Sequence, residues 1–196
     1  MANTCFNSIR VSGPAEQISK LAAALTDIFR DKNRHTSMMR SLLTALGYDE
    51  ASLSDVDLRE DFQLADGPEP VKVENGVLFL SSESAWSFLN STWALVRKAL
   101  PGTEIWHLAE EYSCDVFVTN DRRRRFFTTK WFLDSEEVEP MYFDDDRSLI
   151  EYVHDNCDST VSTMVDLRRF LDDAENEDRF FSLHEISYEF DKNLVF

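Results

Sequence analysis

The apolar residues change their spacing repeatedly along the chain, and this change constrains the fold more than any other feature. Residues 5–11 alternate between apolar and polar, which predicts a strand. Gly13-Pro14 breaks this strand, and Pro14 suits the first turn of a helix. Apolar residues then recur at helical spacing from Ile18 to Phe29, which predicts an amphipathic helix ending near Asp31. A second, short helix is predicted over residues 37–46.

The middle of the chain holds a predicted hairpin and the clearest helical stripe. Residues 71–82 are strand-like, and Asn75-Gly76 stands where a tight type I′ turn would form. The apolar stripe that follows, ended by Pro101-Gly102, consists of Trp86, Leu89, Trp93, Val96 and Leu100. We therefore expect one helix with both tryptophans buried on the same face.

The remaining segments complete an α+β pattern. Residues 48–70 carry eight acids and one arginine with poor periodicity, so we expect a long acidic excursion with at most a short helical turn. Further strands are predicted at 104–112, 114–120, 126–133 and 138–143, and helices at 146–156 and 160–174. Residues 180–190 fit either a strand or a helix. This order predicts an α+β fold, a mainly antiparallel sheet with helices on one face.

Negative charge is concentrated in the last third of the chain. Residues 134–196 contain 19 Asp and Glu against 5 Lys and Arg, whereas residues 1–133 contain 18 against 15. Such a surface opposes sequence-independent binding of nucleic acid, which requires cations to displace phosphate counterions. It suits a partner with a basic surface, and the alternative is a well-solvated acidic surface with no partner. We expect residues 134–196 to form an acidic, chiefly helical extension packed on a core of residues 1–133.

Three short blocks of sequence bear on the family of this chain. They are Met1-Ala2-Asn3 followed by Cys5, Asn7, Ile9, Val11 and Gly13; the apolar run Val77 to Leu80 leading into Ser84-Ala85-Trp86-Ser87; and Glu110-Glu111-Tyr112 followed by Cys114 and Asp115. Over residues 1 to 120 the chain thereby resembles the Api-like proteins carried by phages, plasmids and integrated elements. The resemblance implies a ferredoxin-like fold, a name of shape that requires no iron–sulfur cluster. It implies no activity, since none is established for the family.

The chain departs from the Api-like pattern at three positions. Thr4 replaces the usual Trp, Phe88 stands where a Pro follows Trp-Ser, and Ser113 stands where Gly is common before Cys114. The acidic last third has no counterpart in the resemblance. The resemblance therefore favours a mobile-element protein and leaves its chemistry open.

Few residue patterns in the chain support catalysis or metal binding. The three aspartates from Asp144 to Asp146 lack the spacing and the Gly of a calcium loop, and they suit a helix N-terminus instead. His154 and Cys157 could share a helix face, but two ligands do not close a zinc site. No carboxylate stands two residues before a Lys, as many metal-dependent nucleases require. We predict no catalytic residue, no metal and no cofactor; the alternatives are a metal-dependent enzyme acting on nucleic acid and a self-associating structural or regulatory module.

The only dense basic cluster is the run Arg122 to Arg125. The surrounding acidity favours an internal clamp on carboxylates of the same chain over a contact with a partner or with nucleic acid. The three cysteines, Cys5, Cys114 and Cys157, are far apart and predict reduced thiols rather than a disulfide framework. No apolar run approaches the roughly 18 residues of a membrane span. We expect a protein of the bacterial cytoplasm.

The leading hypothesis is a non-enzymatic interaction protein of a phage or plasmid. Its acidic surface would bind a basic host protein, for example a nucleic-acid-binding defence complex. By mimicking nucleic acid, it would then act as an anti-defence inhibitor. Neither membrane contact nor direct nucleic-acid binding is expected. The predicted partner-binding residues are Asp134, Glu136, Glu137, Glu139, Asp144, Asp145, Asp146, Asp172, Asp173, Glu175, Glu177 and Asp178.

Overall fold

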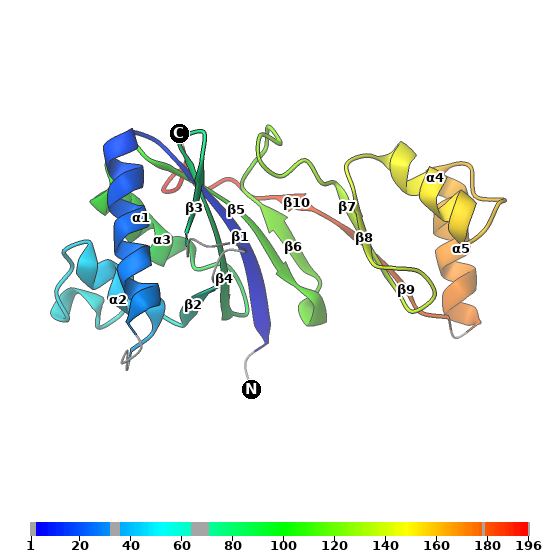
Figure 1. Cartoon of the computed structure of the whole chain (residues 1–196). Helices are drawn as coiled ribbons and strands as arrows, with labels where there is room; N and C mark the ends of the chain where they lie inside the picture. The colour runs from blue at the N-terminus through cyan, green and yellow to red at the C-terminus, as the bar shows by residue number, and fades with distance from the viewer. Residues whose placement is uncertain (1–2, 32–35, 64–70, 178, 196) are drawn as a thin grey trace. The chain divides into compact units, whose positions relative to one another are not determined.

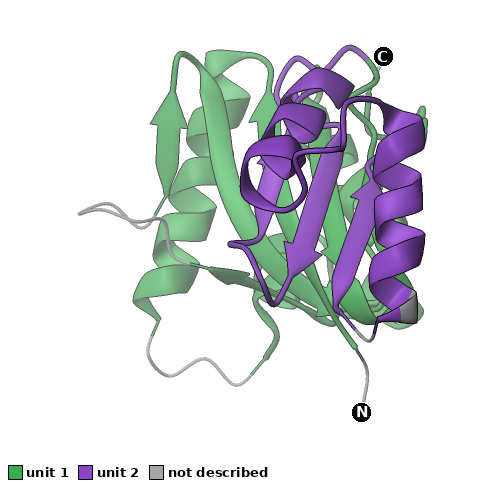
Figure 2. Cartoon of the chain, turned by 90° about the vertical axis from the view of Figure 1, so that its right-hand side faces the viewer, with its two compact units in different colours: residues 1–122, 188–196 green, residues 123–187 purple. Residues whose placement is uncertain are grey.

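The chain forms two compact units. In the computed structural model, residues 3–31, 36–63, 71–177 and 179–195 are described. Unit 1 consists of residues 1–122 and 188–196, and unit 2 of residues 123–187 (Figure 2). The predicted α+β class is confirmed, because helices and mostly antiparallel strands build both units. In chain order the elements are β1 (Thr4–Ser12), α1 (Ala15–Arg30), α2 (Met38–Ala45), the 3-10 turn η1 (Ala51–Leu53), β2 (Glu60–Gln63), β3 (Lys72–Glu74), β4 (Val77–Ala85), α3 (Asn90–Ala99), β5 (Glu104–Glu111), the 3-10 turn η2 (Tyr112–Cys114), β6 (Val116–Thr119), β7 (Trp131–Ser135), β8 (Met141–Phe143), α4 (Asp146–Asn156), α5 (Met164–Asn176), β9 (Phe181–Glu185) and β10 (Ser187–Tyr188).

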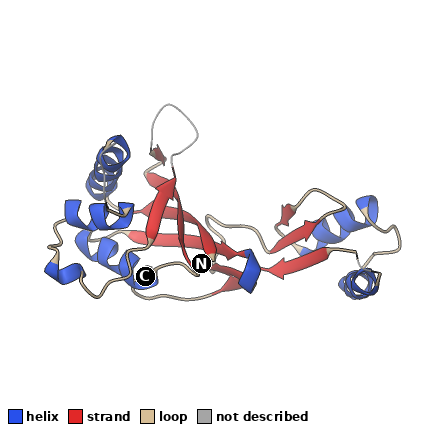
Figure 3. Ribbon diagram, turned by 90° about the horizontal axis from the view of Figure 1, so that it is seen from below, coloured by secondary structure: helices blue, strands red, loops and turns tan. Residues whose placement is uncertain are grey.

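The sheet of unit 1 is centred on β1. Its strand order is β10-β6-β5-β1-β4-β2, and β3 also pairs with β4. β1 is antiparallel to both neighbours, so Ile9 lies opposite Leu80 on β4 and opposite His107 on β5. The helices α1, α2 and α3 lie on one side of this sheet (Figures 1 and 3). This arrangement buries one face of every central strand.

The amphipathic helices form because their apolar residues fall on one side. In α1 the residues buried against the sheet are Ile18, Leu21, Leu25 and Ile28, spaced three or four apart. The helix begins after Pro14, as predicted, because proline needs no N–H partner at a helix start. Burying this stripe against β1, β4 and β5 makes the main hydrophobic core of unit 1.

The predicted hairpin turn at Asn75-Gly76 is confirmed. Both residues have positive φ angles, 50° and 77°, which a type I′ turn requires and which Asn and Gly tolerate best. The turn joins β3 to β4, and Glu74 lies opposite Val77.

The helical stripe starts later than predicted. β4 continues to Ala85, because Ala85 still pairs with Thr4 on β1. Trp86 follows with a φ angle of 71° and is 47% exposed, so the expectation that it is buried on a helix is wrong. α3 begins only at Asn90, and Trp93 is fully buried as expected.

The acidic excursion contains a strand that its sequence did not predict. Its described part, residues 48–63, holds the short turn η1 and then β2, which pairs with β4 over four residues. The excursion was expected to be irregular because its apolar residues are sparse. β2 forms because Phe62 and Glu60 both point into the buried side while their neighbours are exposed. Residues 64–70 lie outside the described residues.

Unit 2 is built on a small sheet of its own. Its strand order is β8-β7-β9, all antiparallel, and α4 and α5 lie on one side of it (Figures 1 and 3). The expectation that the acidic last third is chiefly helical is therefore wrong. The ambiguous segment 180–190 supplies β9 and β10, because Leu183 pairs opposite the buried Leu133 of β7. The boundary predicted between residues 133 and 134 falls inside β7.

After β9 the chain returns to unit 1 and its last residues enter the main core. Leu194 is fully buried and Val195 nearly so. The carbonyl oxygen of Leu194 accepts a hydrogen bond of 2.8 Å from the backbone N–H of Ile105 at the start of β5. Unit 1 is thus completed by a segment that follows unit 2 in the sequence. None of the helices among the described residues is long and apolar enough to cross a membrane.

Candidate functional site

The predicted partner-binding aspartates at residues 144–146 are engaged within unit 2. The Asp144 carboxylate accepts a hydrogen bond of 2.9 Å from the Thr128 hydroxyl, and the other two aspartates build the start of α4. Asp145 is the N-cap, and its carboxylate accepts a hydrogen bond of 2.8 Å from the backbone N–H of Ser148. Asp146 accepts from the Lys130 Nζ at 2.6 Å and from the Trp131 Nε1 at 2.7 Å. These hydrogen bonds lower the pKa of both carboxyls. Both residues therefore have a structural role within unit 2.

A bidentate ion pair joins the β7–β8 turn to the segment that follows α5 in unit 2. The Arg179 guanidinium donates to both carboxylate oxygens of Glu137, at 2.7 and 2.8 Å. This hydrogen bonding lowers the pKa of Glu137 and raises that of Arg179. Glu137 lies in the β7–β8 turn, and Arg179 follows α5, so the turn and the C-terminal end of the helix meet here. Glu177 is 3.7 Å from the same guanidinium.

Five of the predicted residues keep their carboxylates unengaged. Among the described residues, their side chains make no hydrogen bond or ion pair; we call them the acidic end, and they are Asp134, Glu136, Glu139, Asp173 and Glu175. Four of the five are exposed, and Asp134 is half-buried. Asp172 is exposed on α5, and Asp178 lies outside the described residues. The structure thus separates the carboxylates that hold unit 2 together from those that form no hydrogen bond or ion pair with a described residue.

Exposed apolar side chains flank the acidic end. Phe180, which precedes β9, is 48% exposed, and Met141 and Tyr142 on the edge strand β8 are 37% and 43% exposed. Exposed aromatic and methionine side chains within a polar rim are typical of protein–protein interfaces. Sequence reasoning missed them, since an aromatic residue in a strand is more often buried.

The arginine run does not form the predicted clamp on carboxylates. None of the residues Arg122 to Arg125 forms an ion pair with a described residue, and all four are exposed. Arg122 lies over the ring of Tyr188, 5.9 Å from its centroid. Arg124 donates to the backbone carbonyl of Asp144 at 3.0 Å, and not to its carboxylate. Arg124 also attracts the Asp146 carboxylate electrostatically, which contributes to the lowered pKa of Asp146, but it forms no ion pair with it.

The weak metal candidates are not assembled into a site among the described residues. No group of three or more His, Cys, Asp or Glu side chains within those residues could hold an ion. The Nδ1 atom of His154 lies 3.1 Å from the carbonyl oxygen of Val161, so this ring bridges α4 to the loop after it.

A buried polar cluster in unit 1 was not predicted from the sequence. Glu60 on β2 is only 1% exposed, and both of its carboxylate oxygens accept from the Trp93 Nε1, at 2.9 and 3.0 Å. Ser82 also donates to this carboxylate, and Asn7 donates to Ser82 at 3.3 Å. Burial raises the pKa of Glu60 from its ordinary value of 4.5 to about 7. The alternation of a strand could have revealed this buried carboxylate, because Glu60 stands two residues before Phe62 and therefore lies on the same inward side of β2.

His107 lies on the same face of the sheet. Its ring stacks on Phe88, with centroids 3.9 Å apart, and burial lowers its pKa to about 3. Its Nδ1 atom has no hydrogen-bond partner among the described residues. A neutral, stacked imidazole at 3% exposure acts as a packing residue here.

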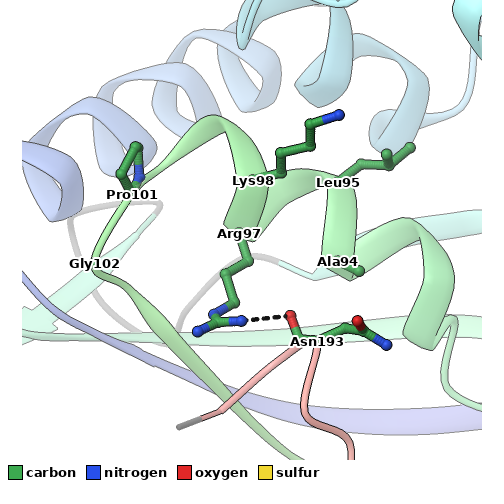
Figure 4. A pocket seen from close by; sticks show the side chains of 7 residues that line it. All are labelled: Ala94, Leu95, Arg97, Lys98, Pro101, Gly102 and Asn193. Atoms are coloured by element: carbon green, nitrogen blue, oxygen red, sulfur yellow. Dashed lines mark hydrogen bonds between the residues drawn. The ribbon is translucent and has the colours of Figure 1, made fainter.

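A hollow of about 450 Å³ opens at the C-terminal end of α3 (Figure 4). Arg97 lines it, but its guanidinium already donates to the backbone carbonyls of Thr103, Lys192 and Asn193, at 3.0, 3.3 and 3.1 Å. These bonds fasten the C-terminal segment to the end of α3. Arg97 therefore has a structural role at this hollow.

Comparison of this chain with protein-family models, with curated proteins and with solved structures gives no match. The resemblance to the Api-like proteins therefore stays a prediction.

Proposed function

We propose that this chain is a non-enzymatic interaction protein whose unit 2 binds a basic surface of another protein. The observation that supports this most is the acidic end: five carboxylates that form no hydrogen bond or ion pair with a described residue, beside the exposed Phe180, Met141 and Tyr142. Exposed carboxylates attract a basic partner and accelerate association, while the apolar side chains supply contact area. Because these carboxylates hold no hydrogen bond or ion pair among the described residues, binding a partner would break none there.

The partner class and the origin of the chain are part of the same proposal. The resemblance to the Api-like proteins supports a phage or plasmid protein, and the charge supports a basic host protein as target. A nucleic-acid-binding defence complex fits, since carboxylates would occupy positions of phosphates and inhibit by mimicry. We also propose a ferredoxin-like core for unit 1, supported by the order β5-β1-β4-β2 with β1 antiparallel to both neighbours.

Charge reversal at the acidic end tests the proposal. The triple variant Glu136→Lys, Glu139→Lys and Asp173→Lys is expected to bind a fluorescent oligo-arginine peptide about tenfold more weakly at low salt, on the basis of about 0–1 kcal/mol per exposed pair. Fluorescence anisotropy measures the binding. The affinity of the native protein should also fall steeply as salt rises, because exposed charges are screened.

The matched control carries the same change of net charge in unit 1. Its substitutions are Asp27→Lys, Asp55→Lys and Glu189→Lys, all at exposed positions. This control should lose much less affinity than the triple variant. Equal losses in both variants would show that overall charge alone attracts the peptide, and salt-independent binding would contradict the proposal as well.

A further inference from the structure

Three exposed aromatic side chains gather at one end of the unit 1 sheet, far from the acidic end in sequence. Phe6 on β1 is 41% exposed, Trp86 after β4 is 47% exposed, and Tyr112 in η2 is 42% exposed. The start of β1 and the end of β4 lie at the same end of the sheet (Figure 1). Large aromatic side chains at such exposure are uncommon in groups and indicate a binding surface.

Asn3 ties the segments that carry these aromatics together. Its carbonyl oxygen accepts a hydrogen bond of 3.0 Å from the backbone N–H of Trp86. Its side-chain Nδ2 lies 3.4 Å from the Sγ of Cys114, two residues after Tyr112. The rings of Phe6 and Tyr112 meet edge to face with centroids 6.3 Å apart. The three aromatics therefore lie at the same end of the sheet, which we call the aromatic end.

The backbone holds Trp86 in a conformation that keeps its indole exposed. A φ angle of 71° is uncommon for a bulky side chain. The adjoining turn maintains it: Ser87 N–H donates to the Ala85 carbonyl at 2.9 Å, and the Ser84 hydroxyl donates to the Ser87 carbonyl at 2.8 Å. Because β4 stops here, the indole does not enter the core.

Acidic residues predominate in the described segments around the aromatic end. The segments that form it, residues 3–8, 60–63, 81–87 and 110–116, contain six acids and no Lys, Arg or His. Of these acids, Asp61, Glu83 and Asp115 are exposed. Aromatic faces attract cations through their quadrupole, and nearby carboxylates strengthen the attraction. The charge complementarity therefore selects a cationic occupant.

We propose that the aromatic end binds an arginine side chain of a basic polypeptide, by cation–π contact with Trp86 and Tyr112. Arginine fits better than lysine, because its planar guanidinium stacks on aromatic faces while its N–H groups reach the carboxylates. This inference rests on the proposed function for the charge of the partner, but it places the contact on unit 1. The protein would then hold its partner at two surfaces.

Aromatic substitution tests the inference with the same fluorescent oligo-arginine peptide. Trp86→Ala should weaken binding about threefold, and Trp86→Ala with Tyr112→Ala about tenfold, as expected for exposed cation–π contacts. Trp86→Phe keeps a ring and should retain most of the affinity. Phe190→Ala, at a 62% exposed aromatic outside these segments, is the matched control and should bind as the native protein does.

Intrinsic fluorescence gives a second readout. Peptide binding should change the tryptophan emission of the native protein, and this change should disappear in Trp86→Phe. If both Ala variants bind like the native protein while the charge-reversed variant of the acidic end binds weakly, the inference fails and the proposed function stands. If the native protein does not bind the peptide at low salt, both fail.

Discussion

Replacing Trp93 by alanine is expected to lower the free energy of unfolding by about 3–5 kcal/mol, the range for deleting a large buried ring. Trp93 is fully buried, and its ring packs on Phe88 and Phe62, with centroids 5.9 and 6.1 Å away. Its indole N–H is also the donor to both oxygens of the buried Glu60. The substitution therefore opens a cavity and removes a hydrogen bond from a carboxylate that water cannot reach.

Urea denaturation followed by circular dichroism measures this loss. Trp86→Ala is the natural control, since removing a side chain that is 47% exposed should change stability by less than about 1 kcal/mol. Trp93→Phe separates packing from hydrogen bonding, and leaving Glu60 without this donor should cost about 1–3 kcal/mol. A loss below about 1 kcal/mol for Trp93→Ala would contradict the burial of the ring.

Glu60→Gln is expected to stabilise the protein above neutral pH by roughly 3 kcal/mol, since each pKa unit corresponds to about 1.4 kcal/mol. Burial raises the pKa of this carboxyl from 4.5 to about 7, so the folded protein holds a proton that the unfolded chain has lost. Between these two values stability must fall as the pH rises. The stability that the protonated Glu60 carboxyl contributes is fully present below about pH 4.5 and is lost as the pH rises through about 7.

The measurement is the free energy of unfolding of both proteins between pH 5 and 8. The difference between Glu60→Gln and the native protein should grow across this window, since glutamine cannot ionise. Parallel curves for Glu60→Gln and the native protein would show that Glu60 does not titrate here.

Local patterns predicted the helices and the tight turn well, and tertiary pairing decided the rest. The apolar residues from Ile18 to Ile28 recur at helical spacing, and the backbone preferences of Asn75 and Gly76 are enough to form the turn. Neither element depends on distant residues. Trp86 and Trp93 look alike in the stripe of apolar residues. They differ because β1 continues far enough to pair Thr4 with Ala85, a contact that the local sequence around Trp86 does not contain.

The candidate site was predicted only in part for a related reason. The excess of carboxylates is visible in the sequence, but the sequence does not show which of them have structural roles. Asp145 caps a helix and Glu137 binds Arg179, whereas Glu136 and Glu139 form no hydrogen bond or ion pair through their side chains within the described part of the chain. The strand β2 was missed because Glu60 occupies an inward position that an apolar residue usually takes. Its partner Trp93 lies 33 residues away, and no local pattern connects the two.

The return of the chain to unit 1 has a consequence for the order of folding during synthesis. Leu194 and Val195 fill the main core, yet the ribosome makes them after all of unit 2. When β1 to β6 have emerged, Ile105 still lacks the carbonyl that its N–H will bond. The 65 residues of unit 2 are therefore made while the first sheet is incomplete, and a pause or truncation before Leu194 would expose the larger core, not the smaller one.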